Sequence, residues 1–177
     1  MALLQEKSYT IDDIYALPDG TRAELIDGDM YMMAPPGLKH QRLVSFIHGT
    51  IFQYIFGKNG DCEIFPAPFA VFLNNDDKTY VEPDISVICD KSKLDEKGCH
   101  GAPDWIIEVV SPGSKRMDYF IKSFKYRTAG VREYWIVDPD KKIVMAYEFD
   151  KDDVNTYSFS EEIPVGIYDR DLRIKIE

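Results

Sequence analysis

The chain has 177 residues, of which 45% are hydrophobic and 29% are charged, as expected of a globular protein long enough to bury a core. We therefore expect one domain over residues 1–177. The net charge of -10 argues against a uniformly basic surface for nucleic acid, and no apolar run approaches the ~18 residues that cross a bilayer.

Three cysteines, Cys62, Cys89 and Cys99, form an odd set without a closely spaced pair. The N-terminal residues also lack the basic start and apolar stretch of a signal peptide. These features predict reduced thiols, a cytoplasmic location and no membrane partner. A zinc site that combines Cys89, Cys99 and His100 is a weaker alternative, because the spacing fits no common zinc motif.

The first third of the chain predicts a short helix, a hairpin and a long helix. Thr10 begins the short helix, with Asp13 at the acidic position of a capping box. Asp27-Gly28 separates two short apolar runs and favours a type I′ hairpin turn. Over residues 38–56 the apolar positions recur at intervals of three and four, which predicts an amphipathic helix.

The rest of the chain predicts strands around one crossover helix. The helix is expected over residues 115–129 with Gly130 at its end, and residues 91–103 are expected to form a loop. Strands are expected over residues 62–65, 69–73, 84–89, 105–110, 134–137, 143–149, 156–159 and 172–176. This order predicts an α+β (mixed α/β) fold, one mixed sheet with helices packed on it and a parallel crossover between residues 105 and 137.

Two of the predicted strands each carry a carboxylate, Asp84 and Glu108, in an apolar run. Carboxylates that meet in a protein interior repel each other unless a cation or a proton lies between them. A divalent metal ion would satisfy both. The crossover helix adds Lys122, with Asp118 one turn before it as an ion-pair partner.

On a helical projection of residues 115–129, four side chains form a stripe that we expect to face the sheet. They are Met117, Ile121, Phe124 and Thr128. Lys122 would then lie beside this stripe and bend its ammonium towards the sheet edge. Six basic residues between 115 and 132 predict either a surface for DNA or an ordinary solvated helix face.

An ordered set of short motifs resembles the Uma-two family of restriction endonucleases. The matching segments, in chain order, are Ala23–Asp29, Pro35-Pro36 with His40-Gln41, Glu82–Val87, Gly101–Pro112, the residues Asp118, Lys122 and Tyr126, and Gly130–Pro139. The resemblance implies the restriction-endonuclease-like fold of PD-(D/E)XK nucleases, a central mixed sheet flanked by helices. It also implies Mg²⁺-dependent hydrolysis of DNA.

The resemblance implies a role for each candidate residue. Asp84 and Glu108, with the carbonyl of Val109, would hold Mg²⁺, for which Mn²⁺ is a substitute. Lys122 would orient or deprotonate the attacking water, or neutralise charge on the phosphate. The superfamily's usual lysine position, two residues after the acid, is Val110 here, so the lysine is displaced to the following helix.

The resemblance also points to Glu24 as a further carboxylate and to His40 as a group that contacts phosphate or polarises a ligand. Each candidate has a plain alternative. Asp84 would be a turn residue at a strand entry, Lys122 would only pair with Asp118, Glu24 would be an exposed hairpin residue, and His40 would only cap its helix.

Two other function classes stay open at this stage. The first is a catalytically silent module that binds nucleic acid or protein on the same fold. The second is a two-carboxylate glycosidase, against which the lysine and the strand positions count. A homodimer is expected only from the exposed edges of a small open sheet.

Overall fold

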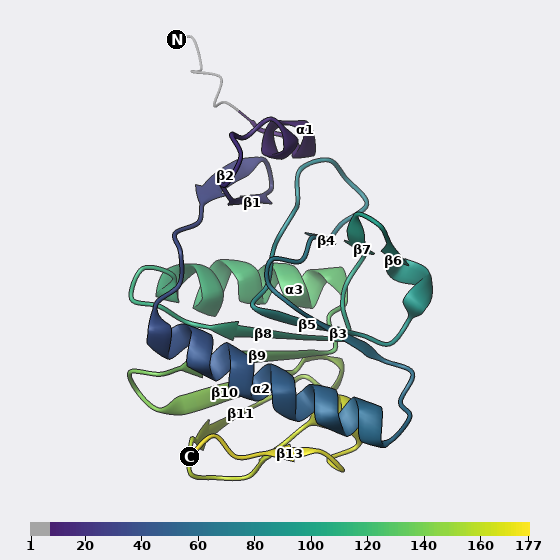
Figure 1. Cartoon of the computed structure of the whole chain (residues 1–177), viewed down its shortest axis with the longest axis vertical. Helices are drawn as coiled ribbons and strands as arrows, with labels where there is room; N and C mark the ends of the chain where they lie inside the picture. The colour runs from purple at the N-terminus through teal and green to yellow at the C-terminus, as the bar shows by residue number, and fades with distance from the viewer. Residues whose placement is uncertain (1–7) are drawn as a thin grey trace.

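The computed structural model describes residues 8–177 and has a six-stranded sheet at its centre, in the order β11-β10-β9-β8-β5-β3 (Figure 1). Neighbouring strands β8 and β9 are parallel, and the other neighbours are antiparallel. The predicted mixed sheet and its parallel crossover are therefore confirmed. The strands are β3 (Glu63–Pro66), β5 (Ile85–Ile88), β8 (Trp105–Val109), β9 (Glu133–Asp138), β10 (Ile143–Glu148) and β11 (Asp153–Ser158).

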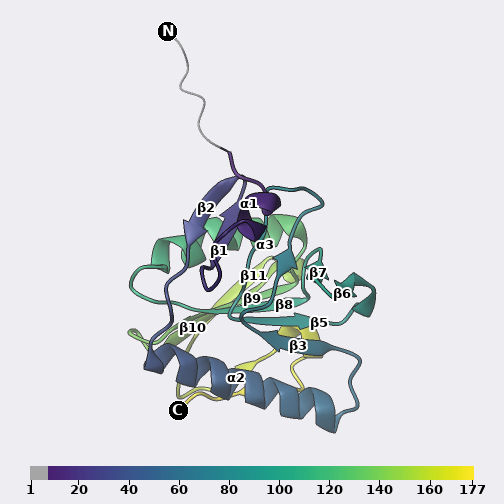
Figure 2. The ribbon, with the colours of Figure 1, turned by 45° about the horizontal axis from the view of Figure 1, so that its top comes forward.

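Helices cover both faces of this sheet (Figures 1 and 2). The long helix α2 (Leu38–Gly57) lies on one face and buries Val44, Ile47, Ile51 and Ile55, at the predicted intervals of three and four. Helix α3 (Ser123–Ala129) lies on the other face and ends at Gly130, whose φ of 97° is the left-handed cap that glycine favours. Within residues 8–177 none of the helices is both long and apolar enough to traverse a lipid bilayer.

The N-terminal part forms a separate unit above the sheet (Figure 2). Helix α1 (Ile11–Tyr15) begins as predicted, with the Thr10 N–H donating to Asp13 Oδ2 at 2.8 Å. Strands β1 (Ala23–Ile26) and β2 (Asp29–Met32) form the predicted hairpin, in which both turn residues have positive φ. Two hydrogen bonds between the backbones of Leu25 and Tyr80 fasten β1 to the body of the protein.

Two parts of the chain differ from their predictions. Residues 91–103 contain a 3-10 turn (Lys91–Lys93) and two short strands, β6 (Leu94–Asp95) and β7 (Gly98–His100), which join β4 (Val71–Phe72) in a small sheet. Residues 172–176, expected in the central sheet, instead supply β13 (Arg173–Ile174), which pairs with β12 (Ile163–Pro164). Strands of two or three residues are too short to show an alternating pattern. Two further 3-10 turns span Phe149–Lys151 and Gly166–Tyr168.

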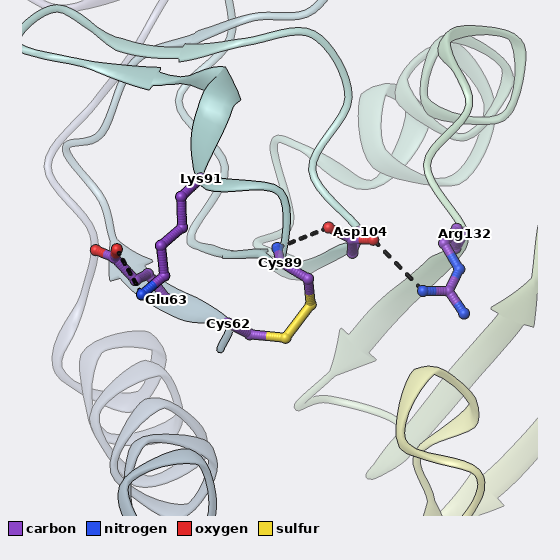
Figure 3. Close-up of a disulfide and its surroundings, with 6 residues drawn as sticks. All are labelled: Cys62, Glu63, Cys89, Lys91, Asp104 and Arg132. Atoms are coloured by element: carbon purple, nitrogen blue, oxygen red, sulfur yellow. Dashed lines mark hydrogen bonds and ion pairs between the residues drawn. A yellow bond between two sulfur atoms is a disulfide. The ribbon is translucent and has the colours of Figure 1, made fainter. Parts of the chain in front are cut away.

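The expectation of reduced thiols is wrong for Cys62 and Cys89, which form a disulfide. Strands β3 and β5 pair with Glu63 opposite Ile88, so the next pair outwards is Cys62 and Cys89 (Figure 3). The strand register decides this pairing, and the sequence spacing does not reveal it. The zinc alternative also fails because Cys89 is taken, and Cys99 is buried as a free thiol.

Candidate active site

A cleft of about 550 Å³ opens between the segment that joins β2 to α2 and the start of the crossover helix. Asp84, which directly precedes β5, and strand β8 contribute its inner end. Six side chains or backbone groups predicted from the sequence line this one cleft: Glu24, His40, Asp84, Glu108, Val109 and Lys122. The structure thus brings together residues from the hairpin, α2, two strands and the crossover helix.

Lys122 lies at the centre of the buried end, where its side chain is 6% exposed. Its Nζ is 2.8 Å from Glu24 Oε2, 2.9 Å from Glu108 Oε1 and 3.8 Å from Asp118 Oδ1. An ammonium has three N–H donors, and three carboxylates surround this one. Burial lowers the pKa of Lys122, but the surrounding carboxylates outweigh it and hold the pKa well above the usual value. Lys122 is therefore a charged ammonium.

The apolar stripe predicted for the crossover helix is right only in its first half, because Met117 and Ile121 pack partly buried against the core while Phe124 and Thr128 are exposed. Asp118, Lys122 and Tyr126, spaced at four, are buried, whereas Phe124 is 63% exposed. The residues Met117–Lys122 form a π-helical turn before α3, a feature that is frequent at functional sites. Lys122 and Tyr126 face inwards because carboxylates of the hairpin and the sheet accept their hydrogen bonds, and Asp118 follows as a partner of Lys122. Hydrophobicity alone does not reveal these pairings.

Glu108 points to the face of the sheet that the crossover helix covers. Side chains alternate along a strand, and Ile106 and Val110, two positions away on either side, pack in the core beside Tyr126. Glu108 Oε1 accepts hydrogen bonds from Lys122 and from the Tyr126 hydroxyl at 2.8 Å. Burial and the neighbouring carboxylates raise the pKa of Glu108 well above its usual value, against the opposing charge of Lys122.

Asp84 lies nearer the cleft mouth, beside His40. Asp84 Oδ2 accepts from the Val109 N–H at 2.8 Å and is 3.0 Å from His40 Nε2, and the Asp84 N–H donates to Glu108 Oε2 at 3.3 Å. Burial lowers the pKa of His40, but its hydrogen bond to Asp84 and the charge of Asp84 outweigh this and raise it. The Val109 contact with Asp84 runs through the Val109 N–H, and a role of the Val109 carbonyl as a metal ligand stays a prediction.

Two of the plain alternatives conflict with this geometry. Glu24 is 4% exposed and accepts from the Glu82 N–H at 3.0 Å, so it is not a surface hairpin residue. Lys122 is nearer to Glu24 and Glu108 than to Asp118. Asp118 was predicted only as the ion-pair partner of Lys122, and no role was predicted for Tyr126, although its spacing of four from Lys122 was a usable signal.

The carboxylate oxygens of the cleft are suitable ligands for a hard divalent cation. Glu24, Asp84, Glu108 and Asp118 line the cleft, and carboxylate oxygens are the ligands that Mg²⁺ prefers. In the part of the chain that the structure describes, however, no three His, Cys, Asp or Glu side chains are arranged as a metal cage. The cation among these carboxylates is the ammonium of Lys122.

The run of basic residues between 115 and 132 is mostly paired with acids. Lys115 lies 3.6 Å from Asp138 Oδ2, Arg132 contacts Asp104 at 3.4 Å, and Lys125 and Arg127 contact Asp27 and Asp152. With Lys122, five of the six basic residues therefore have carboxylate partners. This pattern favours the solvated, ion-paired helix face over a surface for DNA.

The sequence of this chain matches the family described as "Uma2: Putative restriction endonuclease" over residues 11–167. The chain belongs to the Uma2 family. This confirms the resemblance, written above as Uma-two. An uncharacterized protein of Synechocystis is 31% identical to this Uma2 chain over 96 residues, which make up 54% of the chain and 48% of that protein. The match thus spans about half of the relative's length.

A crystal structure described as "a putative nuclease belonging to DUF820" from Anabaena variabilis superimposes on this Uma2 chain with a TM-score of 0.76. The alignment covers 94% of each chain at 22% sequence identity. Similarity at this level of identity shows a shared fold. It confirms the predicted mixed sheet flanked by helices, while the roles of the site residues stay predictions.

Proposed function

We propose that this protein is a Mg²⁺-dependent endonuclease that hydrolyses phosphodiester bonds of DNA. The observation that carries the proposal is the contact between Glu108 on a central strand and Lys122 on the following helix. Asp84, directly before the neighbouring strand β5, joins this pair because its backbone N–H donates a hydrogen bond to Glu108 Oε2 at 3.3 Å. A lysine from the helix thus lies beside the acid in a chain whose strand has Val110 at the usual lysine position.

In the proposed mechanism, Asp84 and Glu108 would hold the metal ion together with the carbonyl of Val109. Bound Mg²⁺ lowers the pKa of a water molecule and stabilises negative charge on the phosphate. The Val109 N–H and His40 orient Asp84, and Tyr126 orients Glu108. Such supporting hydrogen bonds fix the direction of ligand oxygens.

Lys122 supplies positive charge in this mechanism. Its donors point at carboxylates, so we assign it an electrostatic role on the charge that develops at the phosphate, in preference to that of a base. Glu24 holds the ammonium from the hairpin side and is the further carboxylate of the site.

The test is cleavage of single-stranded and duplex DNA in the presence of Mg²⁺ or Mn²⁺. Asp84→Asn and Glu108→Gln should each abolish cleavage, while Glu96→Gln, an exposed carboxylate on the small sheet, should leave it unchanged. Cleavage that survives in the Asp84→Asn, Glu108→Gln double variant would refute the assignment. Melting temperatures of the variants show whether each one is folded.

The second candidate function is a module that binds nucleic acid or protein without cutting. The occupation of the acidic cluster by Lys122 favours it, because the ammonium already neutralises part of the charge. Titration with Mn²⁺ separates the two functions. The enzyme should show saturable binding that requires Asp84 and Glu108, and the silent module should show none.

Location and assembly belong to the same proposal. Because Cys62 and Cys89 form a disulfide, reduced thiols no longer support a cytoplasmic location. The proposal of a cytoplasmic location now rests on the proposed DNA substrate alone. Strands β3 and β11 form the two edges of the central sheet, where a second copy would add strands. The homodimer stays a prediction, which sedimentation of the protein in solution would test.

A further inference from the structure

We infer that the strand which enters the cleft is unpaired, so that the substrate is single-stranded DNA or an unpaired DNA end and not an intact duplex. This inference rests on the proposed function and adds the substrate class. It comes from the depth of the acids, the apolar wall of the cleft and the pairing of its cations.

The acids lie deep in the cleft. The side chains of Glu24 and Glu108 are 6% and 5% exposed, whereas that of Asp84 is 18% exposed. A phosphate therefore reaches Asp84 and its partner His40 more readily than Glu108. A double helix is stiff over about 150 base pairs, so it cannot turn one phosphate inwards cheaply. An unpaired strand rotates its backbone and bases independently.

One wall of the cleft is suited to the flat face of a base. Tyr31 is the direct cross-strand partner of Glu24 in the hairpin, so the two side chains lie on the same face. Met33 and Pro35 continue this wall, and Met117 of the crossover helix lines the cleft as well. Unpaired bases stack on aromatic rings, whereas bases inside a duplex are already stacked on each other.

The cleft offers little to the backbone of a duplex. Duplex-binding proteins typically neutralise several phosphates with free lysines and arginines. The basic side chains that line this cleft are Arg22 and Lys122, and both are paired: Arg22 Nε lies 2.7 Å from Glu82 Oε2, and Lys122 is held by acids. With a net charge of -10, stacking and apolar contact are left as the main source of affinity.

Fluorescence anisotropy without divalent metal tests the inference apart from cleavage. The probes are a short fluorescein-labelled single strand, the blunt duplex of the same sequence, and that duplex with an unpaired tail. We expect the full chain to bind the single strand and the tailed duplex at least about tenfold more tightly than the blunt duplex. Tyr31→Leu should weaken single-strand binding by about tenfold, the loss of one stacked base.

Two further variants complete the test. Met117→Ala lies on the crossover helix and should also weaken binding of the single strand. It provides an independent test in case Tyr31→Leu disturbs the hairpin. Phe56→Leu removes an aromatic ring that is 76% exposed on α2, outside the cleft, and should change nothing.

Equal affinity for the blunt duplex and the single strand would overturn the inference. Unchanged binding by both Tyr31→Leu and Met117→Ala would do the same. If the unpaired strand binds through Tyr31 but is not cut with Mn²⁺, the preference of the cleft for an unpaired strand stands, and the proposed nuclease function falls.

Discussion

The ammonium of Lys122 lies 2.9 Å from Oε1 of Glu108, although one residue belongs to a helix and the other to the central strand β8. The helix covers the face of the sheet to which Glu108 points. A lysine that is displaced along the sequence therefore returns to the same carboxylate in space. This contact makes Lys122 part of the buried charge balance of the fold as well as of the proposed active site.

Lys122→Met should lower the free energy of unfolding by about 3–5 kcal/mol, because it leaves buried carboxylates without their cation. Urea denaturation measures this loss. The matched control is Lys141→Met, whose lysine side chain is 60% exposed and whose effect should stay within about 0.5 kcal/mol.

The same variant provides a test of metal binding. Mn²⁺ should raise the melting temperature of Lys122→Met more than that of the original protein, because a bound cation stabilises the folded state and replaces the lost charge. An equal response of the two proteins to Mn²⁺ would show that the metal does not occupy this acidic cluster.

Tyr126→Phe should cost about 1 kcal/mol of stability, since it removes one buried hydrogen bond to Glu108. If Tyr126 orients a metal ligand, cleavage should also fall by about 10–100-fold with little change in KM. Tyr147→Phe, a partly exposed tyrosine of β10 outside the cleft, serves as the control. A loss of stability with full activity would limit Tyr126 to a structural role.

The His40–Asp84 pair should stabilise the protein more at acidic pH. The folded-state pKa of His40 is raised above 6.5, so its contribution is fully present below that value and disappears as the pH rises through the folded-state pKa. The difference in melting temperature between the original protein and His40→Gln should therefore grow as the pH falls towards about 6.5 and level off below that value.

His48 provides a control of opposite sign. Burial lowers the pKa of His48, so the advantage of the original protein over His48→Gln should shrink as the pH falls. A chemical-shift titration of the two histidines would check both directions directly. A His40 resonance that titrates below 6.5 would contradict the assigned ion pair.

Reduction of the Cys62–Cys89 disulfide should destabilise the protein by about 3 kcal/mol, because the bond closes a loop with a sequence separation of 27. Urea denaturation with and without reductant measures the difference. A Cys62→Ser, Cys89→Ser double variant should be insensitive to reductant. Thiol titration of the unfolded, unreduced protein should find one free cysteine, and three would mean that the bond does not form.

Local signals in the sequence were sufficient for most of the central fold. Asp27-Gly28 predicts the hairpin turn because two adjacent positions need positive φ, and Gly130 predicts the end of the crossover helix. Asp84 and Glu108 were identifiable because a carboxylate in an apolar strand needs a partner. The short strands β6 and β7 were missed because their residues carry no alternating pattern.

The errors at the crossover helix and at the cysteines share a second physical origin, which is contact between segments that are distant in the sequence. The stripe containing Phe124 is apolar, but its helix turns Lys122 inwards because the acids that pair with it lie on the hairpin and on β8. Cys62 and Cys89 meet because of a strand register that neither segment encodes alone. Site geometry depends on these pairings, so it appears only in the folded chain.

The hairpin that supplies Glu24 also carries Tyr31, directly across the two strands. A substitution that displaces the hairpin would therefore change two properties of the cleft at once. It would move a negative charge away from Lys122 and would also shift the aromatic ring that lines the cleft. The charge around Lys122 and the width of the cleft entrance are thus linked through the hairpin that turns at Asp27-Gly28.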